Sequence, residues 1–119
     1  MEETAVIIIL GATGDLTKRK IIPAIYRLIE NEKIRKIALV GVARKDLKID
    51  SILQEARQFI GKINETAWSK IRNSSYYYKL DFYNGNDYQK LGELLQKVEK
   101  KHQLGGNRLF YLATLPEHF

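Results

Sequence analysis

The sequence of 119 residues contains no cysteine, only two prolines, and a single methionine and tryptophan. The absence of cysteine excludes disulfides, zinc–thiolate sites and cysteine nucleophiles. Long hydrophobic runs are also missing. The stretch from Ala5 to Leu10 is far too short to cross a membrane, and no basic leader with a small-residue cleavage site precedes it. We therefore expect a cytoplasmic protein without a membrane partner.

Acidic residues are the minority charge, with 14 Asp and Glu against 20 Lys and Arg and a formal net charge of +6. A basic excess favours an anionic partner, but most of these bases are scattered as on an ordinary solvated surface. Lys18, Arg19 and Lys20 are the exception because they follow a glycine-containing turn. A nucleic-acid-binding protein stays an alternative, although the sequence has neither a helix-turn-helix nor an RNP-like motif.

Apolar residues alternate between two periodicities along the chain. Continuous or β-rich stretches predict four strands, at Ala5–Leu10, Lys36–Val42, Tyr76–Phe82 and Arg108–Leu112. Helical spacing predicts three helices between them, on these apolar positions: Ile21, Ile25, Leu28 and Ile29; Ile49, Ile52, Leu53, Ala56, Phe59, Ile60 and Ile63; Tyr88, Leu91, Leu94, Leu95 and Val98. We expect Asp50 or Ser51 to cap the second of these helices, and a short helical piece at Thr66–Ile71.

Strands that alternate with helices predict an α/β domain with right-handed crossovers. We expect a doubly wound parallel sheet of four strands in the order 3-2-1-4, with helices on both faces. The sequence has no internal repeat and no linker, so residues 1–119 are expected to form one domain. A nucleotide-binding domain of this kind normally has one or two more strands, so we expect an incomplete one.

The glycine turn in VIIILGATGDLTKRKIIPAIYRL, residues 6–28, follows the first predicted strand directly. Gly11 allows a sharp turn, and Gly14 has no Cβ to keep a phosphate from the backbone. Free N–H groups and the dipole of the following helix then favour an anion. The dinucleotide fingerprint is incomplete, because Gly11 and Gly14 have no partner glycine at Thr13 or Leu16, and the spacing excludes a Walker loop. Glycines that serve only as turn residues are the alternative interpretation.

The end of the second predicted strand, VGVARK, indicates which dinucleotide is preferred. In doubly wound domains an acid at this point binds the ribose 2′-hydroxyl of NAD, whereas a base accommodates the 2′-phosphate of NADP. Arg44 and Lys45 stand here, and an arginine can make a bidentate pair with a phosphate. We therefore predict NADP, with an exposed loop arginine as the alternative.

Three segments together resemble the start of glucose-6-phosphate dehydrogenases: GATGDLTKRKIIPAIYRL, VGVAR and NRLFYLATLP, in this order. The resemblance implies a Rossmann-like NADP-binding domain of an oxidoreductase of the pentose phosphate pathway, which oxidises glucose 6-phosphate to 6-phosphogluconolactone. One departure is Glu117, which replaces the second proline of the family pattern. GATG after a strand is also similar to short-chain-dehydrogenase-like or redox-sensing NADP-binding proteins, although these usually have another glycine near Leu16 or Thr17.

The resemblance also implies a set of site residues. We expect the pyrophosphate to bind at Gly11, Ala12, Thr13, Gly14, Asp15, Leu16, Thr17 and Lys18, with Asp15 mainly holding the turn together. Arg44 is expected at the 2′-phosphate, Asp81 and Phe82 beside the adenine, Leu112 and Ala113 near the nicotinamide-side ribose, and Lys20 near the sugar phosphate. No metal site is expected.

The chain ends before the family's E-K-P and R-I-D-H-Y-L-G-K segments, which carry the catalytic residues. His102, at a predicted helix end, and His118, beside the terminus, lack the surroundings of a general base. We therefore expect no catalytic residue in this chain and no activity from it alone. Glucose 6-phosphate would bind only together with the missing domain, and the intact enzyme could be an oligomer.

Overall fold

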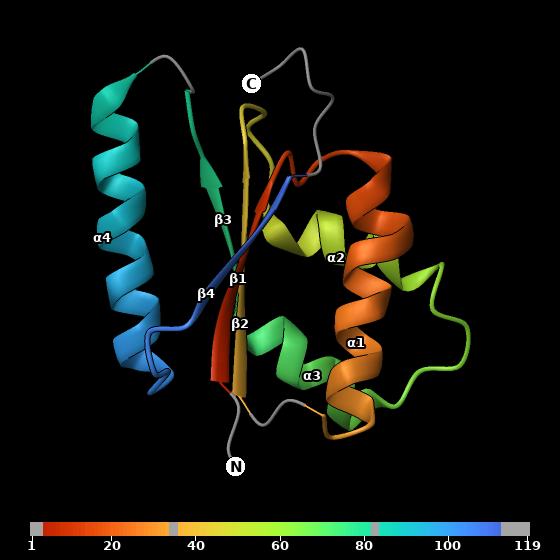
Figure 1. Ribbon diagram of the computed structural model, residues 1–119. Helices are drawn as coiled ribbons and strands as arrows, with labels where there is room; N and C mark the ends of the chain where they lie inside the picture. The colour runs from red at the N-terminus through yellow and green to blue at the C-terminus, as the bar shows by residue number, and fades with distance from the viewer. Residues whose placement is uncertain (1–3, 34–35, 82–83, 113–119) are drawn as a thin grey trace.

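The computed structural model describes residues 4–33, 36–81 and 84–112, which form a parallel sheet between two layers of helices (Figure 1). The strands are β1 (Thr4–Leu10), β2 (Lys36–Ala43), β3 (Ser75–Lys79) and β4 (Arg108–Leu112). They pair in parallel in the order β3-β2-β1-β4. The predicted fold class, strand order and central position of β1 are therefore confirmed.

The helices cover both faces of the sheet, as Figure 1 shows. The π-helix η1 (Thr17–Ile21) continues into α1 (Ile22–Glu30), which packs with α2 (Ile49–Arg57) and α3 (Glu65–Asn73) on one face. The opposite face is covered by α4 (Gly85–Lys101). Ile7 and Ile9 of β1 point to the first layer, and Val6 and Ile8 point to α4. Burial on both faces explains why β1 is continuously apolar.

The apolar stripe from Ile49 to Ile63 does not form one helix, contrary to the prediction. α2 ends at Arg57, and Gly61 adopts a positive φ of 82° that a continuing helix does not allow. Phe59, which was assigned to the buried stripe, is 40% exposed as a result. Helical spacing alone did not reveal this break, because Gly61 sits between apolar positions that keep the helical period.

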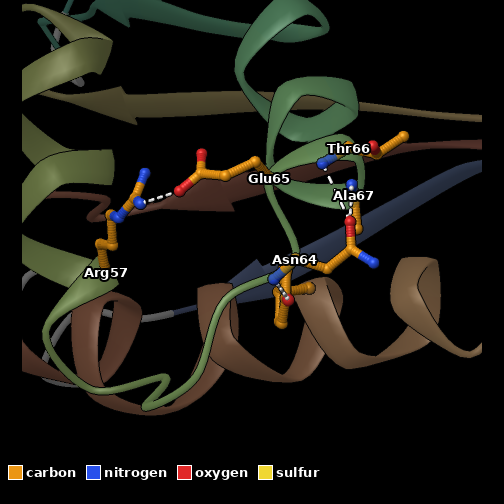
Figure 2. A network of polar contacts seen from close by, with 6 residues as sticks. Arg57, Asn64, Glu65, Thr66 and Ala67 are labelled. Carbon is orange, nitrogen blue, oxygen red and sulfur yellow. Dashed lines mark hydrogen bonds and ion pairs between the residues drawn. The ribbon is translucent and has the colours of Figure 1, made fainter.

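The predicted cap of α2 is also wrong. Lys48 is the N-cap residue and supplies no side-chain hydrogen bond, while Asp50 lies in the first turn. A side-chain cap is present instead at α3, where Asn64 Oδ1 accepts hydrogen bonds from the backbone N–H groups of Thr66 (2.9 Å) and Ala67 (3.2 Å) (Figure 2). This cap separates α3 from α2 and fixes where α3 begins.

The remaining differences from the sequence expectations lie at element ends. β3 ends at Lys79, so Asp81 is in the segment that follows the strand, and Phe82 lies outside the described residues. Leu28 and Tyr88, assigned to apolar helix faces, are exposed. None of the helices in the described ranges has the length and apolar character that crossing a bilayer requires.

Candidate functional site

The glycine turn leaves β1 at its carboxyl end and is tied to β2. Gly11 has φ of 86°, in the left-handed region that favours glycine. The N–H groups of Gly11 and Ala12 both donate to the Val42 carbonyl oxygen, at 2.8 and 3.1 Å. Gly14 N–H donates to Gly11 O at 3.1 Å, whereas Thr13 N–H makes no hydrogen bond within the described parts of the chain. The turn therefore has a fixed backbone, and its Thr13 N–H is a donor that no described residue occupies.

Gly41, which the sequence analysis did not single out, permits this close approach of β2 to the turn. A Cβ added at Gly41 would lie 2.9 Å from the Cβ of Ala12, closer than real Cβ contacts. Ala12 itself is only 1% exposed and cannot move aside freely. The available signal was a glycine inside a predicted strand, which often marks the close approach of another backbone.

The residues that follow the turn have contrasting environments. Leu16 is 49% exposed, whereas Thr17 is fully buried and its hydroxyl has no hydrogen-bond partner among the described residues. Lys18 forms an ion pair with Glu55 of α2. An orphaned buried hydroxyl beside the turn is a polar group that a bound ligand or water could satisfy.

The other two bases of the cluster differ from Lys18. The Arg19 guanidinium lies 3.7 Å from Asp15 and 4.7 Å from the ring centroid of Phe59. Because Asp15 and Arg19 are four residues apart on the same chain segment, their contact is compatible with the expected role of Asp15 in the turn. Lys20 is exposed and has no ion-pair partner among the residues described. Of these three adjacent bases, Lys18 and Arg19 thus have a carboxylate partner, whereas Lys20 has none within the described ranges.

Strand register brings most of the predicted site residues to one edge of the sheet. Leu10 pairs with Val42 on one side and with Leu112 on the other, so the turn, the end of β2 and the end of β4 are neighbours. Arg44 follows the last residue of β2 directly. The edge between β1 and β4 is also the point where the strand order reverses, which is where open α/β sheets bind ligands.

Arg44 is exposed at this edge and has no ion-pair partner in the described part of the chain. The segment after it is held from β3, because the Tyr77 hydroxyl donates to the carbonyl oxygen of Lys45. Burial, and secondarily the negative charge of Asp46, raises the pKa of Tyr77 above its ordinary value, so the hydroxyl stays protonated and able to donate. The cation at the end of β2 thus stands on an anchored segment.

The predicted adenine and nicotinamide residues are described only in part. Asp81 is exposed, and its N–H donates to Asp87 Oδ2 at 2.9 Å. Leu112 ends β4 beside Leu10. Phe82 and Ala113 lie outside the described residues.

A cavity of about 390 Å³ lies at the opposite edge of the sheet, meaning the end of the strands where β2 begins. Its lining residues include Lys36, Lys70 and His102. None of the predicted site residues is among its lining residues. His102 Nε2 is 2.6 Å from the Tyr76 hydroxyl. The imidazole is half-buried, and this burial, with a smaller effect of Lys101, lowers its pKa. His102 is therefore remote from the glycine turn, and His118 lies outside the described residues.

Residues 8–119 match the family model described as glucose-6-phosphate dehydrogenase, NAD binding domain. The chain belongs to this family. A nicotinamide dinucleotide is accordingly its class of cofactor. The turn fits one, because the Thr13 N–H and the Thr17 hydroxyl have no hydrogen-bond partner among the described residues. The short-chain-dehydrogenase alternative is not favoured.

Curated relatives carry the name glucose-6-phosphate 1-dehydrogenase. The protein of Bacillus subtilis is 40% identical over 116 residues, which cover 97% of this chain and 24% of that protein. The protein of Chlamydia muridarum is 35% identical over 121 residues, covering 96% of this chain and 24% of its own length. The chain thus spans about a quarter of the length of the curated relatives it matches.

Solved structures give the same family likeness. A glucose-6-phosphate dehydrogenase in complex with its substrate glucose-6-phosphate superimposes with a TM-score of 0.86 at 27% identity, covering 99% of this chain and 26% of that one. Glucose-6-phosphate 1-dehydrogenase from Mycobacterium avium gives 0.76 at 26% identity, covering 97% of this chain and 24% of the other. The likeness therefore extends over nearly the whole of this chain.

Proposed function

We propose that this chain is the NADP-binding domain, or most of it, of a cytoplasmic glucose-6-phosphate dehydrogenase of the pentose phosphate pathway. The observation that carries the choice of NADP is Arg44, which is exposed, without an ion-pair partner among the described residues, and next to the glycine turn at the same edge of the sheet. No carboxylate precedes it at the end of β2, where NAD-specific domains have one.

The pyrophosphate of the cofactor binds at the turn from Gly11 to Lys18. The Thr13 N–H, which makes no hydrogen bond to any described residue, supports this assignment. The dipole of the following helix contributes roughly 0.3–1 kcal/mol for a partly exposed anion. Thr17 belongs to the same proposed site, and its hydroxyl, which has no hydrogen-bond partner among the described residues, is a polar group for the ligand to satisfy. Asp15 keeps its contact with Arg19 and holds the turn from outside.

The two ends of the cofactor extend from this turn in opposite directions along the sheet edge. Arg44 pairs with the 2′-phosphate, and Asp81 and Phe82 border the adenine on the side of β3. Leu112 and Ala113 border the nicotinamide-side ribose on the side of β4. The strand order supports this direction, because β2 and β3 lie on one side of the turn and β4 lies on the other.

In the intact enzyme the nicotinamide accepts a hydride from C1 of glucose 6-phosphate. This chain binds and orients the dinucleotide, and Lys20 attracts the phosphate of the sugar. The base that removes the C1-hydroxyl proton comes from outside residues 1–119, since His102 lies at the opposite edge of the sheet. The solved relative in complex with glucose-6-phosphate supports the choice of substrate.

Titration of the purified chain with NADP and NAD tests this proposal. The unmodified chain binds NADP more tightly, and Arg44→Ala removes most of the difference, because one charge-assisted phosphate contact contributes roughly 1–3 kcal/mol. Arg72→Ala, which removes an exposed arginine near the end of α3, is the matched control and leaves both affinities unchanged. Equal affinity of the unmodified chain for the two dinucleotides contradicts the assignment of NADP.

A further inference from the structure

Lys18 differs from Arg44 and Lys20, the other two cations expected to meet a phosphate, because it already has a partner. Its ammonium group forms an ion pair with Glu55, from the last turn and a half of α2, and the two side chains are 21% and 54% exposed. Arg44 and Lys20 have no such partner among the residues described. Lys18, the cation nearest to the glycine turn in sequence, is therefore paired with the Glu55 carboxylate before a ligand binds.

We propose that Glu55 sets the affinity for the dinucleotide by competing with its pyrophosphate for Lys18. This inference rests on the proposed function, since it takes the glycine turn as the pyrophosphate site. A lysine ammonium is a compact charge on a flexible stem, so it can leave one anion for another. Because Glu55 is more than half exposed, this ion pair contributes little to folding, and its exchange for a phosphate is easy. Binding then replaces the Glu55 contact of Lys18 with a phosphate contact.

The surroundings of Glu55 separate this role from a structural one. α2 is held to the sheet by Ile52, Leu53 and Ala56, which are all buried. Glu55 lies beside them on the exposed side of the helix. Replacement by glutamine keeps the shape of the side chain and removes only its charge. The Glu55→Gln variant is therefore expected to fold as the unmodified chain does.

The place of Lys18 also predicts which part of the cofactor responds. Lys18 lies four residues after Gly14 on the segment that follows the turn, whereas Arg44 stands at the end of β2. The pyrophosphate is common to NAD and NADP. Removing the charge of Glu55 therefore increases the affinity for both dinucleotides to the same extent. Arg44→Ala, in contrast, weakens NADP alone, because only NADP carries the 2′-phosphate, and so removes most of the difference in affinity between the two dinucleotides.

A second ion pair on the same helix provides the matched control. Arg57 of α2 pairs with Glu65 at the start of α3, as Figure 2 shows, and these side chains are 32% and 68% exposed. The pair resembles Lys18–Glu55 in charge and exposure but lies away from the glycine turn, between α2 and α3. Glu65→Gln should leave the affinity for either dinucleotide unchanged.

The experiment measures dissociation constants of NAD and NADP for the unmodified chain, Glu55→Gln and Glu65→Gln, by fluorescence or calorimetric titration. Glu55→Gln is expected to bind both dinucleotides about two- to fivefold more tightly at about 0.02 M salt, with a smaller gain at about 0.5 M, because salt screens exposed charges. The same substitution is then made in a Lys18→Gln background. There the gain should disappear, because the two side chains act as one coupled pair.

Three results overturn the inference while the proposed function stands. They are an unchanged or weaker affinity of Glu55→Gln, a gain confined to NADP, and a gain that persists in the Lys18→Gln background. Thermal unfolding of each variant identifies a loss of affinity that comes from misfolding. In that case Glu55→Asp, which keeps the charge on a shorter side chain, should bind each dinucleotide with a dissociation constant within twofold of that of the unmodified chain. An unmodified chain that binds neither dinucleotide overturns the proposed function together with this inference.

Discussion

Replacing Gly41 by alanine tests the contact between β2 and the glycine turn. The added Cβ would lie 2.9 Å from the Cβ of Ala12, whereas carbon atoms pack best about 3.5–4.0 Å apart. The turn cannot yield easily, because two of its N–H groups are bonded to Val42 O in the same strand. Overpacking of this kind costs about 1–3 kcal/mol, and the lower chain entropy of alanine offsets about 0.4–1 kcal/mol of it.

The net loss of roughly 0.5–2 kcal/mol corresponds to a fall in Tm of about 2–8 °C for a chain of this size. Thermal unfolding followed by circular dichroism measures it. Gly92→Ala is the control, because nothing lies within 4 Å of the added Cβ and the residue is in the middle of α4. Alanine is the better helix former there, so Tm should rise by about 2–4 °C. A Tm of Gly41→Ala equal to or above that of the unmodified chain would refute the reasoning.

A compensating substitution makes the test specific. Ala12→Gly removes the side chain that the new Cβ meets, so Gly41→Ala should cost less in that background than alone. The coupling between the two substitutions is expected to be about 0.5–1.5 kcal/mol, as for residues in contact. Strict additivity would mean that the two positions do not touch.

Three further predictions concern α3, β4 and catalysis. Asn64→Ala should lower the free energy of unfolding by about 1 kcal/mol in denaturant titration, since it removes the cap of α3. Hydrogen bonding to Arg108 lowers the pKa of Glu99. The stabilisation by this pair is therefore complete above the ordinary glutamate pKa of about 4.3 and is lost as the pH falls through the lowered value. Glu99→Gln should be less stable than the unmodified chain at neutral pH, and the difference in stability should shrink in acid. Purified chain mixed with NADP and glucose 6-phosphate should form no NADPH above background, because we expect no general base in this chain and such a base contributes about 10²–10⁴-fold in rate. Turnover by the chain alone would contradict this prediction.

The sheet could be predicted from the sequence because its signals are local. β1 is apolar at every position from Ala5 to Ile9 and is buried on both faces, and β4 was placed with its exact bounds. The order of the strands follows from strand–helix alternation and the glycine turn after β1. The family resemblance came from motifs in the same segments.

The details that a local pattern does not carry were missed. Gly61 interrupts an apolar stripe without changing its period, so α2 was predicted too long. The pairing of Lys18 with Glu55 joins residues on separate helices and depends on how these pack. The importance of Gly41 depends on Ala12, which meets it only when β2 pairs with β1. The last two are tertiary contacts, whereas Gly61 acts through its own backbone conformation.

Amide chemical shifts of the ¹⁵N-labelled chain during titration with NADP test the central claim, that the glycine turn and the end of β2 form the dinucleotide site. The account predicts that the largest shifts occur at Gly11–Lys18 and around Arg44. Shifts concentrated instead at Lys36, Lys70 and His102, which line the cavity at the opposite edge, or no shifts at saturating NADP, would contradict it.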